Sequence, residues 1–336
     1  MRFPASPEIL VIKTTSLGDV LHGTSVLPIL KKNFPSCRIT WVVDRAALEI
    51  VRQNPIISRV IVSDFRAWQK LWWREPARVL REALALLTQI HDTRYALVFD
   101  IQGLLRTVVL LLAARSSRKF VKGRWPFLRG FGDKKRLHAL VEIRRVLEVA
   151  GLTTFAAPMS FATGPKERAR VDGLWPQTGK VVLVSPFTGW PSKTWSPRHF
   201  AELIRRLPPE LNVFVTGDAP SRDAAEAIAR ESGHPRVRNL CGEIDLAAFA
   251  HLASRSHAML AGESFAAHVA GAVGLPVAIL FGPTDEKRIG PVGERFRILR
   301  APDCRICYRP HCRKRCLDAI PPQAALDAVM ELLATP

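Results

Sequence analysis

The sequence predicts an α/β protein with two doubly wound domains, each a parallel sheet between layers of helices. Short apolar, β-branched runs alternate with helical patterns along most of the 336 residues, which is typical of βαβ units. The alternation fades near 153–164, where Pro158 and Gly164 interrupt it, and then starts again. We therefore place the first domain at 1–160, the second at 161–320 and a last helix at 321–336.

The strands of the first domain are predicted at 8–12, 38–43, 59–62, 95–99 and 119–121. Its helices are predicted at 20–30, after Asp44, and at 75–89, 104–114 and 137–149. The basic segment 122–136 contains Gly and Pro and is expected to be a loop. In the second domain, strands are predicted at 181–184, 213–216, 258–261 and 277–281, and helices at 200–207, 219–231, 246–253, 266–273 and 323–333.

The charge of the chain is strongly positive and unevenly placed. The formal net charge is +19, and residues 66–145 hold 18 Lys or Arg against 6 Asp or Glu. Trp68, Trp72, Trp73 and Trp125 lie in the same span. Basic residues beside Trp suit nucleic acid, an anionic membrane or an acidic glycolipid, and a solvated basic face is the plainer alternative. The N-terminus lacks a signal-peptide pattern, and the longest apolar run is too short for a membrane span, so a cytoplasmic protein is expected.

The loop Lys13–His22 follows the first predicted strand and leads into the first helix. In an open α/β sheet, such loops lie at the carboxyl ends of the strands, where ligands bind. Gly18 lets the backbone approach a ligand, and Asp19 stands at the start of the helix. Asp19 is therefore either a helix cap or a base at the end of the sheet.

Three loops of the second domain occupy the equivalent position. The loop Ser185–Trp195 contains Lys193, which could hold a phosphate or be an ordinary exposed lysine. Ser264 is a good N-cap, and the helix start behind it is an anion site in its own right. His268 would lie on the same side as Ser264, although a lone His is more often structural. The third loop is 281–285.

Four cysteines are clustered at Cys304, Cys307, Cys312 and Cys316. In a reducing compartment, this density favours a structural zinc site over disulfides, and unliganded thiols are the alternative. Cys37 and Cys241 are isolated and expected to be buried apolar residues.

The chain resembles the lipopolysaccharide heptosyltransferases, glycosyltransferase family 9. The resemblance rests on 12–22 (Ile-Lys-Thr-Thr-Ser-Leu-Gly-Asp-Val-Leu-His), 66–70, 100–104, 193–195, 239–242 and 281–285, in this order and spacing. Several of these blocks, with Trp41–Val43 and His138, are similar to the heptosyltransferase I branch in particular.

This resemblance implies the GT-B fold, with two Rossmann-like domains facing a cleft and the last helix crossing back to the N-terminal domain. It implies inverting, metal-independent transfer of heptose from ADP-heptose to a lipid A that carries Kdo. Asp19 would be the general base and Lys193 would stabilise the leaving diphosphate. No cofactor would be required, and the enzyme would be a monomer at the inner face of the inner membrane, in peripheral contact with anionic lipid.

The resemblance also assigns residues to the two substrates. Those assigned to the donor nucleotide sugar are Thr188, Gly189, Glu263, Ser264, His268 and Thr284. Those assigned to the acidic glycolipid acceptor are Gly18, His22, Arg66, Lys70, Gln102, Arg106 and His138. Similar cysteine clusters in some members make Cys304–Cys316 structural rather than catalytic.

One block departs from the family pattern. Members commonly have Asp-Thr-Gly where this chain has Glu263-Ser264-Phe265, so Phe replaces a glycine near the nucleotide. The departure leaves open a family 9 enzyme with another nucleotide sugar or a later core acceptor. A nucleic-acid-binding protein is a further alternative, but the basic span lacks the motifs of RRM, KH and helix-turn-helix modules.

Overall fold

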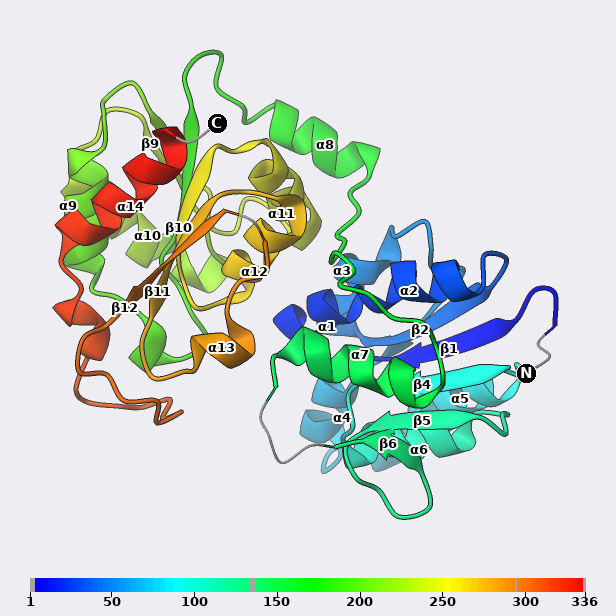
Figure 1. Cartoon of the computed structure of the whole chain (residues 1–336). Coiled ribbons are helices and arrows are strands. Elements are labelled where there is room, and N and C mark those ends of the chain that lie inside the picture. Colours follow the sequence, from blue (N-terminus) through cyan, green and yellow to red (C-terminus); the bar gives the residue numbers. More distant parts are fainter. Residues whose placement is uncertain (1–3, 133–136, 294, 335–336) are drawn as a thin grey trace. The chain divides into compact units, whose positions relative to one another are not determined.

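The computed structural model describes residues 4–132, 137–293 and 295–334. The chain forms two compact units, Met1–Ala162 and Thr163–Pro336. Each unit contains a six-stranded parallel sheet with helices packed against it (Figure 1). Within the described ranges, no helix is both long enough and apolar enough to span a bilayer.

The first unit has the strand order β3-β2-β1-β4-β5-β6. The strands are β1 (Glu8–Ile12), β2 (Arg38–Asp44), β3 (Arg59–Ser63), β4 (Leu97–Asp100), β5 (Lys119–Lys122) and β6 (Arg129–Phe131). The helices are α1 (Leu17–Gly23), α2 (Val26–Asn33), α3 (Leu48–Arg52), α4 (Phe65–Leu71), α5 (Pro76–His91), α6 (Leu105–Ala113) and α7 (Ala139–Val149). The direction of winding reverses between β1 and β4, which are paired with Ile12 opposite Asp100. The loops after these two strands therefore start side by side, at the point where such sheets bind ligands.

The core explains why these runs become strands. Ile9 to Ile12 are fully buried, as are Val42 and Val98 on the neighbouring strands. A strand covered on both faces reads as a continuous apolar run, which is the pattern that predicted it.

The segment 122–136 was predicted as a loop, and this prediction is wrong because it contains β6. Residues 129–131 pair in parallel with Phe120–Lys122. A Cβ at Gly130 would lie 2.5 Å from the Gly123 carbonyl oxygen, so only glycine permits this close pairing. Three residues are too few to show a strand period in the sequence.

The second unit has the strand order β12-β11-β10-β7-β8-β9. The strands are β7 (Val181–Ser185), β8 (Asn212–Val215), β9 (Val237–Asn239), β10 (Ala258–Gly262), β11 (Val277–Phe281) and β12 (Phe296–Arg300). The helices are α8 (Pro165–Asp172), α9 (Pro197–Arg206), α10 (Arg222–Ser232), α11 (Leu246–Arg255), α12 (Phe265–Val273), α13 (Glu286–Ile289) and α14 (Pro322–Ala334). Here β7 and β10 are the paired central strands, with Ser185 opposite Ala261.

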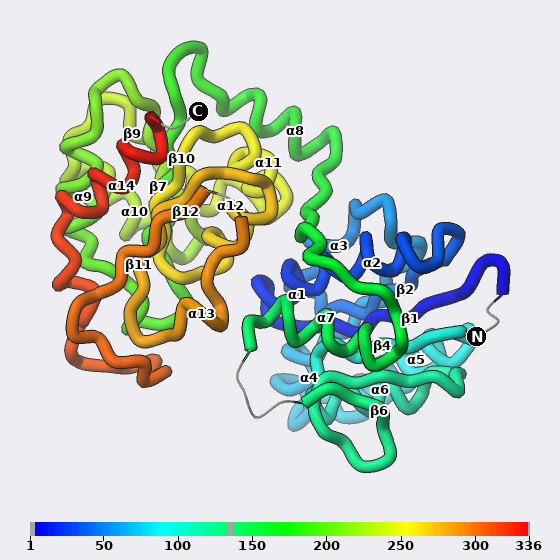
Figure 2. Tube along the Cα trace, in the orientation of Figure 1, coloured from blue at the N-terminus to red at the C-terminus, as the bar shows by residue number. Residues whose placement is uncertain are grey.

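The last helix, α14, packs within the second unit. Its buried residues Ala325, Val329 and Leu332 belong to one apolar cluster with residues of β7, β10 and β11. The helix contacts α9 and the β10–β12 part of the sheet, as its red trace shows in Figure 2. Its buried face therefore packs on the sheet of the second unit, and its predicted packing on the N-terminal domain stays a prediction.

Candidate active site

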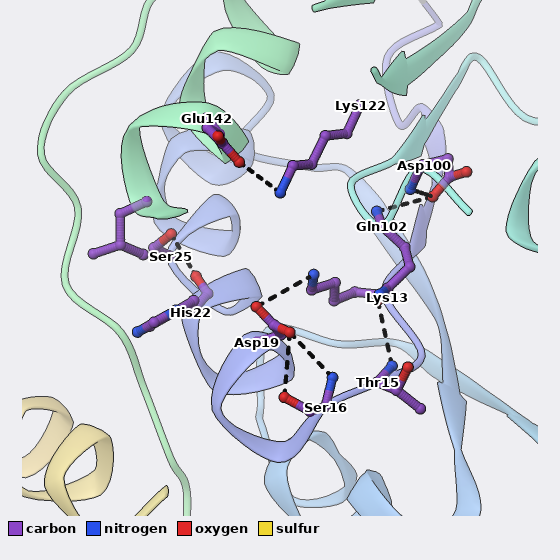
Figure 3. A network of polar contacts seen from close by, with 12 residues as sticks. Lys13, Thr15, Ser16, Asp19, His22, Ser25, Asp100, Gln102, Lys122 and Glu142 are labelled. Carbon is purple, nitrogen blue, oxygen red and sulfur yellow. Dashed lines mark hydrogen bonds and ion pairs between the residues drawn. The ribbon is translucent and has the colours of Figure 1, made fainter. Parts of the chain in front are cut away.

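The loops after β1 and β4 are joined by side-chain hydrogen bonds. The backbone N–H of Thr15 donates to Oε1 of Gln102 at 3.4 Å, and the Arg106 guanidinium donates to the Thr15 hydroxyl at 3.0 Å. Two residues predicted to bind the acceptor, Gln102 and Arg106, thus lie against the loop that leads to Asp19. Figure 3 shows Gln102 beside Thr15.

Buried Asp100 holds the loop after β4 in place. Its Oδ1 accepts from the backbone N–H groups of Gln102 at 2.9 Å and Gly103 at 3.0 Å, and its Oδ2 accepts from the Thr107 hydroxyl at 2.9 Å. Burial raises the pKa of Asp100, while these donors oppose the rise. The carboxyl group therefore positions Gln102, and its own oxygens are occupied by the loop.

Asp19 lies in the first turn of α1, where its carboxylate closes a capping box with Ser16. Its Oδ2 accepts from the Ser16 backbone N–H at 3.3 Å and from the Ser16 hydroxyl at 3.2 Å. Its Oδ1 lies 3.9 Å from Nζ of Lys13 (Figure 3). The Asp19 side chain remains 45% exposed, so a carboxylate fixed at the helix start is also open to a substrate.

The electrostatics of the site favour an ionised Asp19. Desolvation raises the pKa of this carboxyl group, but Lys13, the Ser16 N–H, His22 and Lys122 lower it, and the net pKa is below the ordinary value. A carboxylate that stays deprotonated at neutral pH is available to accept a proton.

Lys13 is a component of this site that was not predicted. Its side chain is almost fully buried, and burial lowers its pKa to about 8, with Asp19 opposing the shift. The sequence contained a signal for this burial. Lys13 directly follows a continuous apolar run, and a side chain at the end of a buried strand is itself shielded from solvent.

The remaining predicted acceptor residues fall into two places. Gly18 is part of α1, and the rings of His22 and His138 lie with centroids 6.1 Å apart, so α1 and the start of α7 are neighbours. Lys122 and Glu142, 2.7 Å apart, form an ion pair at the same end of the sheet (Figure 3). Arg66 and Lys70 lie on the exposed surface of α4.

In the second unit, the strand ends bring together Lys193, Glu263, Thr284 and Trp190. The ammonium of Lys193 forms an ion pair with Oε2 of Glu263 and lies 4.1 Å from the centre of the Trp190 ring. Thr284 donates to the same Oε2 at 2.9 Å. Burial raises the pKa of Glu263, and the neighbouring Lys193 and Thr284 oppose it. Lys193 is therefore a held cation, not an exposed loop lysine.

Thr188 and Gly189 lie in the loop that leads to this cluster. The Thr188 hydroxyl donates to the Trp190 carbonyl at 2.8 Å, and Gly189 is exposed. A Cβ at Gly262 would lie 2.6 Å from Cγ2 of Thr188 and 3.2 Å from the Lys193 carbonyl oxygen, so a larger residue here would displace the loop. Close packing therefore favours glycine at position 262, which directly precedes the Glu263-Ser264-Phe265 block that departs from the family pattern.

The start of α12 adds backbone amide groups to this end of the sheet. Ser264 is the N-cap, and among the described residues its hydroxyl is buried without a hydrogen-bond partner. His268 is buried in the second turn of the helix. A helix start with an uncommitted buried hydroxyl is suited to an anionic group such as a phosphate.

The structure does not show the predicted structural zinc site. In the parts of the chain that the structure describes, no group of three or more His, Cys, Asp or Glu is placed to hold a metal ion. Cys304 and Cys316 pack on the apolar core of the second unit, whereas Cys307 is exposed. Burial, with Cys316 beside it, raises the pKa of the Cys304 thiol to about 12. The cysteine loop is hydrogen-bonded to the loops after β7 and β11, since Ser192 N–H donates to the Pro310 carbonyl and Cys307 N–H donates to the Pro283 carbonyl.

Two Rossmann-like units with amide- and cation-lined strand ends are the architecture of GT-B glycosyltransferases. The family model of glycosyltransferase family 9 (heptosyltransferase) matches residues 83–317. The chain belongs to glycosyltransferase family 9 and is an enzyme that transfers a glycosyl group.

Individual relatives agree with this assignment. Lipopolysaccharide heptosyltransferase 1 of Pseudomonas aeruginosa is 27% identical over 322 residues, which cover 91% of this chain and 87% of the relative. The Escherichia coli K12 enzyme of the same name is 24% identical over 306 residues, covering 88% and 94%. The structure of E. coli heptosyltransferase WaaC with ADP has a similar fold, with a TM-score of 0.80, 23% identity and coverage of 97% of this chain and 99% of that one.

The first prediction concerns Lys13. Replacing it with Met removes the ammonium that lowers the pKa of Asp19, so the pKa of Asp19 rises. If Asp19 is the general base that the resemblance implies, the transfer rate falls as Asp19 gains a proton, and we expect the acidic limb of the kcat/KM profile to move to higher pH. Lys119→Met is the control, because it removes the same charge from β5 and is not among the groups that shift Asp19. An acidic limb that stays in place in Lys13→Met contradicts this coupling.

Proposed function

We propose that the enzyme transfers heptose from ADP-heptose to a lipid A acceptor that carries Kdo, in the synthesis of the lipopolysaccharide inner core. The proposal is supported most directly by the Asp19 loop, where a half-exposed carboxylate with a lowered pKa is held at the carboxyl end of β1. It is also supported by the names of the relatives, which are lipopolysaccharide heptosyltransferases. One solved relative of similar fold holds ADP-2-deoxy-2-fluoro heptose.

The donor would bind at the strand ends of the second unit. Its diphosphate would be met by Lys193 and by the N-terminus of α12 with the Ser264 hydroxyl, while Thr188, Gly189, His268 and Thr284 line the surroundings. The diphosphate would compete with Glu263 for the Lys193 ammonium. These groups supply positive charge as the leaving group departs, so the step needs no metal ion to stabilise it.

The acceptor would bind at the strand ends of the first unit. Gln102, Arg106 and His138 lie beside the segment that holds Gly18, Asp19 and His22. Arg66 and Lys70 on α4 would meet the acidic groups of the glycolipid. Asp19 takes the proton of the acceptor hydroxyl while that oxygen attacks the anomeric carbon and the diphosphate leaves from the opposite face. This single displacement inverts the anomeric centre. Since the acceptor is a membrane lipid, the enzyme would act at the inner face of the inner membrane. It would act there as a monomer.

A panel of nucleotide sugars with purified Kdo-bearing lipid A tests this assignment. Mass spectrometry of the product should show one heptose added from ADP-heptose, and little addition from ADP-glucose or UDP-glucose. Preferential use of another nucleotide sugar would favour the second candidate, a family 9 enzyme with a different donor. That candidate is motivated by Phe265, the bulky residue that begins α12.

A further inference from the structure

One face of the first unit exposes apolar side chains that the catalytic site does not use. On α6, Leu105, Val109 and Leu112 are exposed at the spacing of one helical stripe. Leu80 and Leu84 form a second stripe on α5. Leu105 is 70% exposed, which is far beyond what a residue in a packed core shows.

Contacts between α4, α5 and α6 place these stripes side by side. The ring of His91, at the end of α5, lies 3.0 Å from the Ala113 carbonyl at the end of α6. At the other end, the Trp68 indole N–H donates to Glu82 at 2.7 Å and ties α4 to α5. The turn after α4 adds Trp72 and Trp73, of which Trp73 is 87% exposed. We call this surface the α4–α6 face; its apolar residues are Trp72, Trp73, Leu80, Leu84, Leu105, Val109 and Leu112.

The charge around the α4–α6 face is positive. Its exposed basic residues are Arg66, Lys70, Arg74, Arg78, Arg81 and Arg106. The acidic residues of α5 and the turn before it, Glu75 and Glu82, both form ion pairs with Arg78, at 3.0 and 2.9 Å. Exposed leucine and tryptophan within a basic rim match the interface of an anionic bilayer, where apolar side chains insert and basic ones meet phosphate groups.

We infer that the α4–α6 face docks the enzyme on an anionic lipid bilayer. A second copy of the chain is a poorer occupant, because a symmetric contact would set one basic rim against another. The face is also continuous with the proposed acceptor site: Arg106, in the first turn of α6, donates to Thr15 in the Asp19 loop and lies 5.5 Å from the centre of the Phe65 ring of α4. Docking would therefore hold the loop close to lipid head groups, an advantage that rests on the proposed function.

Co-sedimentation with vesicles tests the inference without donor or acceptor. The full chain should bind vesicles of phosphatidylethanolamine and phosphatidylglycerol, and bind phosphatidylcholine vesicles weakly. The double variant Leu105→Ser/Leu112→Ser should lower the partition coefficient by about tenfold or more, since it removes two inserting side chains. Arg74→Gln/Arg81→Gln should lower it by about tenfold on anionic vesicles only. The control, Val149→Ser/Met330→Ser, changes two exposed apolar residues on α7 and α14 and should bind as the unaltered chain does.

Circular dichroism melting identifies any variant that fails to fold, and Leu112→Ser alone then replaces the double variant. Absence of binding to anionic vesicles, or equal binding by the leucine variant and the control, overturns the inference. The chain could also self-associate in the absence of lipid. If Leu105→Ser/Leu112→Ser abolishes this self-association, the α4–α6 face binds a second copy, and the inference is overturned. Loss of vesicle binding with unchanged transfer to a detergent-dispersed acceptor supports it. Failure of heptose transfer in every sample, with the vesicle results as expected, would refute only the proposed function.

Discussion

Asp19→Asn should reduce the rate of heptose transfer by about a thousandfold, within the range expected for loss of a positioned general base. The amide has the size of the carboxylate, and its oxygen can still accept from the Ser16 N–H, so α1 keeps its capping contact. Initial rates at saturating donor and acceptor, with thermal melting of both proteins, measure the effect.

The control separates helix capping from proton transfer. Asp245 caps α11 in the second unit, where its carboxylate accepts from the Ala248 N–H at 2.7 Å. Asp245→Asn should therefore transfer heptose at the rate of the unaltered enzyme. Transfer by Asp19→Asn within about tenfold of that rate would show that Asp19 is only a cap, since a general base contributes more than this.

Lys193→Met should lower kcat by about a hundredfold or more, because the leaving diphosphate loses its cation. This variant also strands the buried Glu263 carboxylate, and removing one partner of a buried ion pair costs about 3–5 kcal/mol of stability. A rate loss alone would not show which effect caused it. Melting curves should be measured beside the kinetics.

The double variant Lys193→Met/Glu263→Gln resolves the two effects. The neutral glutamine removes the stranded charge and can still accept from the Thr284 hydroxyl. We expect the double variant to recover most of the lost stability and none of the lost rate. Recovery of kcat together with stability would mean that Lys193 serves the fold and not the leaving group.

The sequence predicted the fold because its strands are buried on both faces. Runs such as Ile9–Ile12 and Val181–Val184 leave little choice but a parallel sheet, and the loops that follow them lie at its ligand-binding edge. The position of α14 was not predictable in this way. Its apolar stripe could cover any sheet, and only the structure shows that it covers the sheet of its own unit.

The sequence predicts the position of a candidate-site residue when that position depends on neighbouring residues. It does not predict the contacts that join loops distant in the sequence. Asp19 at a helix start follows from its spacing after β1, as does Ser264 after β10. The pairing of Lys193 with Glu263 joins residues 70 positions apart, and no short-range pattern encodes it. Four closely spaced cysteines suggested a metal site, but among the described residues no group of side chains is placed to hold a metal ion.

The anomeric configuration of the transferred sugar tests the central claim most directly. It is measured by NMR on the product formed from ADP-heptose and Kdo-bearing lipid A. If Asp19 activates the acceptor for a single displacement, the new glycosidic bond has the configuration opposite to that of the donor. A product with the donor's configuration would contradict this mechanism, and with it the role assigned to the loop after β1.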